Sequence, residues 1–194
     1  MSVVESIKKA TSTAFSFEIL PPLKGNGLDS VMNTIDILRE FDPKYINITT
    51  HRSERVREWN ADGSSKVVSL RRRPGTVAVA AAIHHKYNIP VVPHILCGGF
   101  TREETEYVLI DLQFLGITDL LLLRGDKAVE EKYYLPTSGG NAHAVDLQQQ
   151  INEFNSGVFE DGSKMPHLLA PFRYGMACYP EKHEDAPSLE SDLF

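Results

Sequence analysis

The chain has 194 residues, a formal net charge of −6 and 42% hydrophobic residues, with Cys97 and Cys178 as its two cysteines. This length can bury one sizeable core, and the net negative charge argues against a nucleic-acid-binding surface. No stretch approaches about 18 consecutive apolar residues, so we expect no membrane span. Both cysteines lie in apolar, strand-like stretches, and buried free thiols suit a reducing cytoplasm.

Strand patterns alternate with helix patterns along the whole chain. The strand patterns, rich in branched and aromatic residues, span residues 14–20, 45–50, 90–97, 118–123 and 174–181. The helix patterns span residues 28–40, 74–87, 101–115, 144–155 and, as a beginning only, 187–194. Such alternation predicts βαβ units and therefore an α/β fold with parallel strands.

Local signals support several of these bounds. Thr101 followed by Glu104 is a capping-box pattern for a helix start, and Gly116 is a typical helix-stop residue. The segment 52–73 is charged and lacks clear periodicity, so it predicts a long loop on the active face.

The most hydrophobic strand pattern ends abruptly in polar residues. The run Leu120–Leu123 is apolar on both faces, as a buried strand of a parallel sheet must be, and Arg124, Gly125 and Asp126 follow it. In βα-repeat proteins ligands bind at the carboxyl ends of the strands, so polar residues at these ends are functional candidates. Other candidates of this kind are Glu18, Thr49, His94 and the segment 179–183.

A doubly wound sheet and a (β/α)8 barrel both fit alternating units. Neither the dinucleotide-binding fingerprint nor the P-loop pattern follows any strand. In a barrel, catalytic residues from several strand ends converge on one face, as the candidates here would, and a typical barrel needs about 250 residues. The sequence therefore predicts a TIM (β/α)8-type barrel truncated after about five βα units, with residues 1–194 as the N-terminal part of a single domain.

Four motifs in register with the strand ends carry a resemblance to a known family. They are FSFEILPP at 15–22, PHILC at 93–97, LLRGD at 122–126 and YPEKH at 179–183. In this order they resemble the motifs of methylenetetrahydrofolate reductase, over nearly the whole chain. The resemblance implies a barrel oxidoreductase that binds FAD and uses NADH or NADPH. It also implies reduction of 5,10-methylenetetrahydrofolate to 5-methyltetrahydrofolate, a step of one-carbon metabolism and methionine biosynthesis.

The resemblance assigns two catalytic roles. Glu18 matches the acid that helps open the folate ring to its reactive iminium, and an apolar strand favours a protonated carboxyl group, which suits a proton donor. The alternative for Glu18 is a structural glutamate paired with an internal Arg or Lys. Asp126 matches an aspartate beside the flavin and the folate, where a negative charge helps hydride leave the flavin. Without the family, the Arg-Gly-Asp triplet is as compatible with a helix-cap turn.

The resemblance also implies a set of flavin contacts. They are Thr49, His94, Arg124, Gly125, Asp126, Ala144, Tyr179, His183, Ala186 and Asp192. A lone strand histidine is more often a satisfied core group than a ligand, and Tyr179 has a bland alternative as a core aromatic. The family commonly has Thr-Tyr-Gly after the second strand, whereas this chain has TTHRSE at 49–54 and a longer charged loop. Nicotinamide handling at that loop therefore stays open.

Two rival interpretations remain. The chain could be a non-catalytic fragment that folds or self-associates without turnover, or another barrel enzyme with convergent strand-end residues. The family's later flavin-contacting lysine and folate-contacting glutamine and arginine would lie beyond Phe194. Five units would leave strand edges and apolar helix faces open, which favours a homo-oligomer. No Cys/His spacing suggests a metal site.

Overall fold

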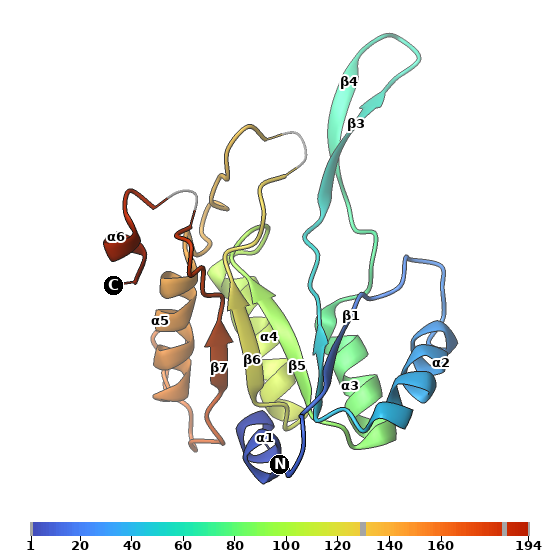
Figure 1. The fold of residues 1–194 in the computed structure, drawn as a ribbon. Coiled ribbons are helices and arrows are strands. Elements are labelled where there is room, and N and C mark those ends of the chain that lie inside the picture. Colours follow the sequence, from blue (N-terminus) through green and yellow to red (C-terminus); the bar gives the residue numbers. More distant parts are fainter. Residues whose placement is uncertain (1, 129–130, 184–185, 194) are drawn as a thin grey trace.

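A computed structural model describes residues 2–128, 131–183 and 186–193. Its main sheet has the order β1-β2-β5-β6-β7, and every neighbouring pair is parallel. The strands are β1 (Ser16–Ile19), β2 (Tyr45–Ile48), β5 (Val91–Leu96), β6 (Asp119–Leu123) and β7 (Arg173–Met176). Each parallel strand is added on the same side of the previous one (Figure 1). This order lacks the reversal of a doubly wound sheet, so the expected parallel α/β fold is confirmed and that alternative is excluded for the described strands.

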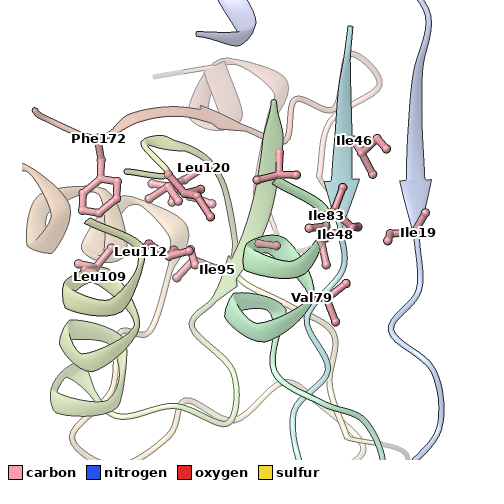
Figure 2. Close-up of a cluster of buried hydrophobic side chains, with 14 of the residues drawn as sticks. Ile19, Ile46, Ile48, Val79, Ile83, Ile95, Leu109, Leu112, Leu120 and Phe172 are labelled. Atoms are coloured by element: carbon pink, nitrogen blue, oxygen red, sulfur yellow. The ribbon is translucent and has the colours of Figure 1, made fainter. Parts of the chain in front are cut away.

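Four helices cover one face of this sheet. They are α2 (Asp29–Leu38), α3 (Thr76–Tyr87), α4 (Arg102–Phe114) and α5 (Ala144–Asn155). Figure 2 shows side chains of α3 and α4, such as Ile83 and Leu112, beside alternate strand residues such as Ile95. Apolar residues of α2 and α5 belong to the same contiguous core. Leu122, the centre of the leucine run, is fully buried in this core. Burying such a side chain contributes roughly 1.5–3 kcal/mol, so this layer holds the sheet and its helices together.

The N-terminal helix α1 (Val3–Lys9) was not expected from the sequence. Ser2 and Glu5 form a capping box at its start, a signal of the same kind as that at Thr101. The Val3 N–H donates to Asp119 Oδ2 at 3.2 Å, which fixes α1 near the beginning of β6. Two further short helices are η1 (Arg39–Phe41) and α6 (Leu189–Leu193). None of the described helices is long and apolar enough to cross a membrane.

The segment 52–73, expected as an irregular loop, forms an antiparallel hairpin of β3 (Glu54–Trp59) and β4 (Ser65–Leu70). The turn closes where the Asn60 N–H donates to the Ser64 carbonyl, and Gly63 has φ +83°. Charged residues stand on both faces of the hairpin, which hides the alternation that marks a half-buried strand. The hairpin rises as an arm beyond the carboxyl end of β2 (Figure 1).

The last strand is shorter than expected, because β7 ends at Met176. Cys178 and Tyr179 therefore lie beyond the strand and are exposed. The expectation of two buried thiols is right for Cys97, which is 1% exposed, and wrong for Cys178.

Candidate active site

The face of the sheet opposite the helices carries the predicted polar residues. Side chains alternate along a strand, so burial of Ile19 and Ile95 against the helices turns Glu18 and His94 to the other face. Glu18 Oε2 lies 3.7 Å from His94 Nε2, although the two strands that carry them are separated by β2. The fold thus brings together two residues 76 positions apart that the sequence proposed independently.

His94 is buried yet incompletely satisfied. It is 4% exposed, and its Nε2 has no hydrogen-bond partner among the described residues. Burial lowers the pKa of His94, and the Glu18 carboxylate partly opposes this effect. The backbone is fixed, since the Thr50 hydroxyl donates to the His94 carbonyl at 2.6 Å. Buried polar atoms normally have hydrogen-bond partners. His94 is therefore not the purely structural core histidine, with both ring nitrogens hydrogen-bonded, that was the alternative to a ligand-binding role.

Glu18 is not in the apolar surroundings that the sequence suggested. Its side chain is 59% exposed. The cause is its position: among the described strands β1 pairs only with β2, and Glu18 points away from the helices. The internal Arg or Lys partner of the alternative interpretation is absent from the described residues, where the ionisable group beside Glu18 is the His94 imidazole. A role of Glu18 as an acid therefore depends on its side chain being able to reach a bound ligand, and not on burial of its carboxyl group.

The end of β6 forms a turn against the end of β5. Gly125 has φ +84°, and the Gly98 N–H donates to the Arg124 carbonyl at 3.0 Å. The Arg124 guanidinium lies 4.7 Å from the centre of the Tyr134 ring. Asp126 follows the turn and is exposed. The next helix along the chain, α5, begins only at Ala144, so the triplet is not a helix cap.

A second ion pair at this end was not anticipated. Arg52 Nη2 lies 3.0 Å from Glu131 Oε2, and both side chains are less than one-fifth exposed. A Cβ atom on Gly99, which has φ +85°, would lie 2.4 Å from Arg52 Cβ. Gly99 is therefore required for this approach. The sequence offers the Gly-Gly pair as a signal, but nothing local relates it to an arginine 47 residues earlier.

A pocket of about 120 Å³ opens beside His94. Its polar lining includes Thr50, His51, Arg71 and Arg73. Burial, and secondarily the Arg73 charge, lowers the pKa of His51. Thr49 is not part of this lining, and its hydroxyl donates to the Ile19 carbonyl at 3.4 Å. The pocket thus combines cationic groups with apolar residues of α3, α4 and β5, among them Val77, Val108 and Ile95.

The remaining predicted contacts gather beyond β7 and at the start of α5. The rings of Tyr179 and His183 meet edge to face with centroids 5.0 Å apart, and the Ala186 N–H donates to the His183 carbonyl. Tyr179 is 48% exposed and so is not a core aromatic. Ala144 is half-buried as the first residue of α5. Asp192 lies in α6, and its side chain is outside the described part of the structure.

These features define a parallel α/β protein that presents polar side chains on the open face and at the carboxyl ends of its strands. Residues 3–194 match the family model described as methylenetetrahydrofolate reductase, and the chain belongs to this family.

Curated relatives agree with this membership. Methylenetetrahydrofolate reductase (NADH) 1 of Arabidopsis thaliana is 27% identical over 99% of this chain and 28% of its own length. The 5,10-methylenetetrahydrofolate reductases of Salmonella typhimurium and Escherichia coli are 27% and 26% identical, each over 92% of this chain and 48% of their own length. The chain thus spans about a quarter to a half of these relatives.

Proposed function

We propose that this chain is part of a flavin-dependent oxidoreductase that reduces 5,10-methylenetetrahydrofolate to 5-methyltetrahydrofolate with NADH or NADPH. The observation that carries the proposal is the pairing of Glu18 with His94 on the open face of the sheet, in a chain of this family. Two motif residues from separate strands meet there, as convergent catalytic groups do.

We infer that the five βα units, residues 1–194, are the N-terminal part of one (β/α)8 barrel. The strand order supports this, because each parallel strand is added on the same side. The placement of the four long helices on a single face also supports it, since barrel helices form one outer ring.

The polar groups of the open face and of the carboxyl ends of β5 and β6 fit FAD. His94 Nε2 and the Tyr134 hydroxyl are both buried without partners among the described residues, and a polar ligand would satisfy them. Bound flavin would supply hydride transfer between nicotinamide and folate. Arg124 and His94 would contact it, with the other positions that the family resemblance assigns. Asp126 would add a negative charge that disfavours anionic reduced flavin, and Glu18 would deliver a proton to the folate.

The test is Glu18→Gln, with flavin binding, NADH oxidation and folate reduction measured separately. We expect bound flavin and NADH oxidation to persist while folate reduction falls about 10²-fold or more, the usual effect of losing a general acid. Glu54→Gln, which removes a carboxylate from the arm, is the matched control and should retain folate reduction. Unchanged folate reduction in Glu18→Gln would refute the acid role.

The second candidate function is a non-catalytic, self-associating fragment, and a specific observation favours it. Tyr107, Ile110 and Phe114 form an exposed apolar stripe on α4, with Phe114 87% exposed. We propose a homo-oligomer that covers this stripe. Light scattering after gel filtration should give a multiple of 21.7 kDa that Phe114→Ser lowers. A monomer would refute self-association, and a colourless protein after FAD addition would favour the non-catalytic fragment.

A further inference from the structure

The two faces of the β3–β4 arm differ in charge. In the antiparallel register, Glu54 and Glu58 share one face with Lys66. Both carboxylates are paired, Glu58 with Lys66 at 3.3 Å and Glu54 with Arg72, which follows the end of β4, at 2.6 Å. This face is therefore internally neutralised.

The opposite face of the arm combines positive charge with exposed apolar groups. Arg55, Arg57 and Trp59 alternate along β3, and Val67 of β4 lies across from Arg57. Trp59 is 69% exposed and Val67 is 59% exposed. Neither arginine forms a salt bridge within the described residues, although the chain as a whole has a net charge of −6. We call these four residues the cationic face.

Helix α4 carries complementary groups on the side that faces away from the core. Five exposed residues, spaced three or four positions apart, share this side: Glu103, Tyr107, Ile110, Asp111 and Phe114. We call them the acidic stripe, and it contains the apolar residues that the proposed homo-oligomer would cover. Leu109 and Leu112, on the other side of the helix, are buried in the core. In the part of the chain that the structure describes, neither carboxylate of the stripe forms a salt bridge.

The cationic face and the acidic stripe lie on separate parts of the same chain. Figure 1 shows the arm rising beyond the carboxyl end of β2, whereas α4 lies along the sheet. In the proposed barrel the helices form the outer ring, so the stripe would face outward there as well. The cationic face of one copy can therefore reach the acidic stripe of another copy.

We propose that the cationic face of one copy binds the acidic stripe of a second copy, an inference that rests on the homo-oligomer proposed above. The two surfaces have similar lengths. Arg55 and Trp59 are about 14 Å apart along β3, at about 3.4 Å per strand residue. Glu103 and Phe114 are about 16 Å apart along α4, at about 1.5 Å per helix residue. One arm can therefore follow the whole stripe.

The chemistry of the two surfaces also agrees. A guanidinium group pairs with a carboxylate through two parallel hydrogen bonds, so the two arginines suit Glu103 and Asp111. Trp59 would pack on the apolar residues of the stripe. Tryptophan and arginine are among the residues that contribute most to binding at protein interfaces. Each copy gives one arm and receives another, so identical contacts can close into a symmetric assembly.

Charge reversal on each surface tests the contact. The arm variant is Arg55→Glu with Arg57→Glu, and the helix variant is Glu103→Arg with Asp111→Arg. In each variant alone, every contact brings like charges together, so the dissociation constant of the oligomer in sedimentation analysis should rise at least about tenfold. All four residues are exposed, so the substitutions leave the core intact.

Mixing the two variants is the decisive measurement. The acidic arm of one variant would meet the basic helix of the other, and the unsubstituted arm would meet the unsubstituted helix, so association should return. Trp59 is the only tryptophan of the chain, and its emission should shift to shorter wavelength as the mixture or the unsubstituted chain associates. The matched control is Lys8→Glu with Lys9→Glu on α1, at the end of the sheet opposite the arm. It makes the same change in net charge and should associate like the unsubstituted chain.

Three results would overturn the inference. If the unsubstituted chain is a monomer, the proposed homo-oligomer is wrong and the arm contact is lost with it. If the oligomer forms but persists in the arm variant, or forms without a change in Trp59 emission, the homo-oligomer stands and the arm is not what covers α4. If both variants are monomers and their mixture is also monomeric, the two surfaces do not bind each other.

Discussion

The Glu18–His94 pair makes a direct prediction about a single titration. Glu18 Oε2 and His94 Nε2 are 3.7 Å apart, and a unit charge pair at this distance attracts by about 1 kcal/mol in a water-like dielectric. The value for a water-like dielectric applies because the Glu18 side chain is 59% exposed. Glu18→Gln removes this attraction and leaves the burial of His94 unchanged. The pKa of His94, already lowered by burial, should fall further.

The assay is an NMR titration of the seven histidine ring signals, with His94→Asn identifying the signal of His94. Asp126→Asn is the control, because Glu18 is the carboxylate that opposes the lowering of the His94 pKa. That control should leave the His94 titration where it is in the unsubstituted chain. An unchanged midpoint in Glu18→Gln, or an equal fall in Asp126→Asn, would refute the pairing.

Three further predictions concern stability and reactivity. Burial lowers the pKa values of His51 and His94 in the folded chain. As pH falls through about 6.5, the unfolded chain therefore takes up protons at these histidines before the folded chain does, and the free energy of unfolding decreases. The urea midpoint should be lower at pH 5.5 than at pH 7, less so in His94→Asn, and equal midpoints would contradict this. Leu122→Ala, at a fully buried position, should lower the free energy of unfolding by about 3 kcal/mol in a denaturant titration. Ile37→Ala, at a position that is 64% exposed, should change that free energy by less than about 0.5 kcal/mol. A thiol reagent should label Cys178 in the native chain and Cys97 only after unfolding, because burial raises the pKa of Cys97 to about 12; one rate for both would be inconsistent with the fold.

Elements with local causes were predictable from the sequence. The helix α5 has the predicted bounds, 144–155, and Thr101 caps α4 as expected. The leucine run forms β6. Capping and hydrophobic runs depend on neighbours within a few residues, so a sequence contains their whole signal. The strands of the β3–β4 arm were not predicted, because the arm carries charged residues on both faces and has few apolar positions.

Contacts across the fold were not predictable from patterns alone. The resemblance proposed Glu18 and His94 separately, but their approach depends on the order β1-β2-β5, which no local feature specifies. The pair of Arg52 and Glu131 joins residues 79 positions apart and gave no sequence signal. Asp126 stays a prediction, since it is exposed and its role depends on a bound flavin.

The exposure of Glu18 changes the physical argument for its proposed role. A carboxylate in an apolar strand is costly when both faces are buried, yet alternation puts only Ile19 in the core and turns Glu18 outward. The strand can therefore hold an acid at little desolvation cost, since the Glu18 side chain is 59% exposed, while burial lowers the pKa of His94 beside it. A ligand seated on this face would lie within reach of the exposed Glu18 carboxyl group, and this reach is what the proposed proton delivery requires.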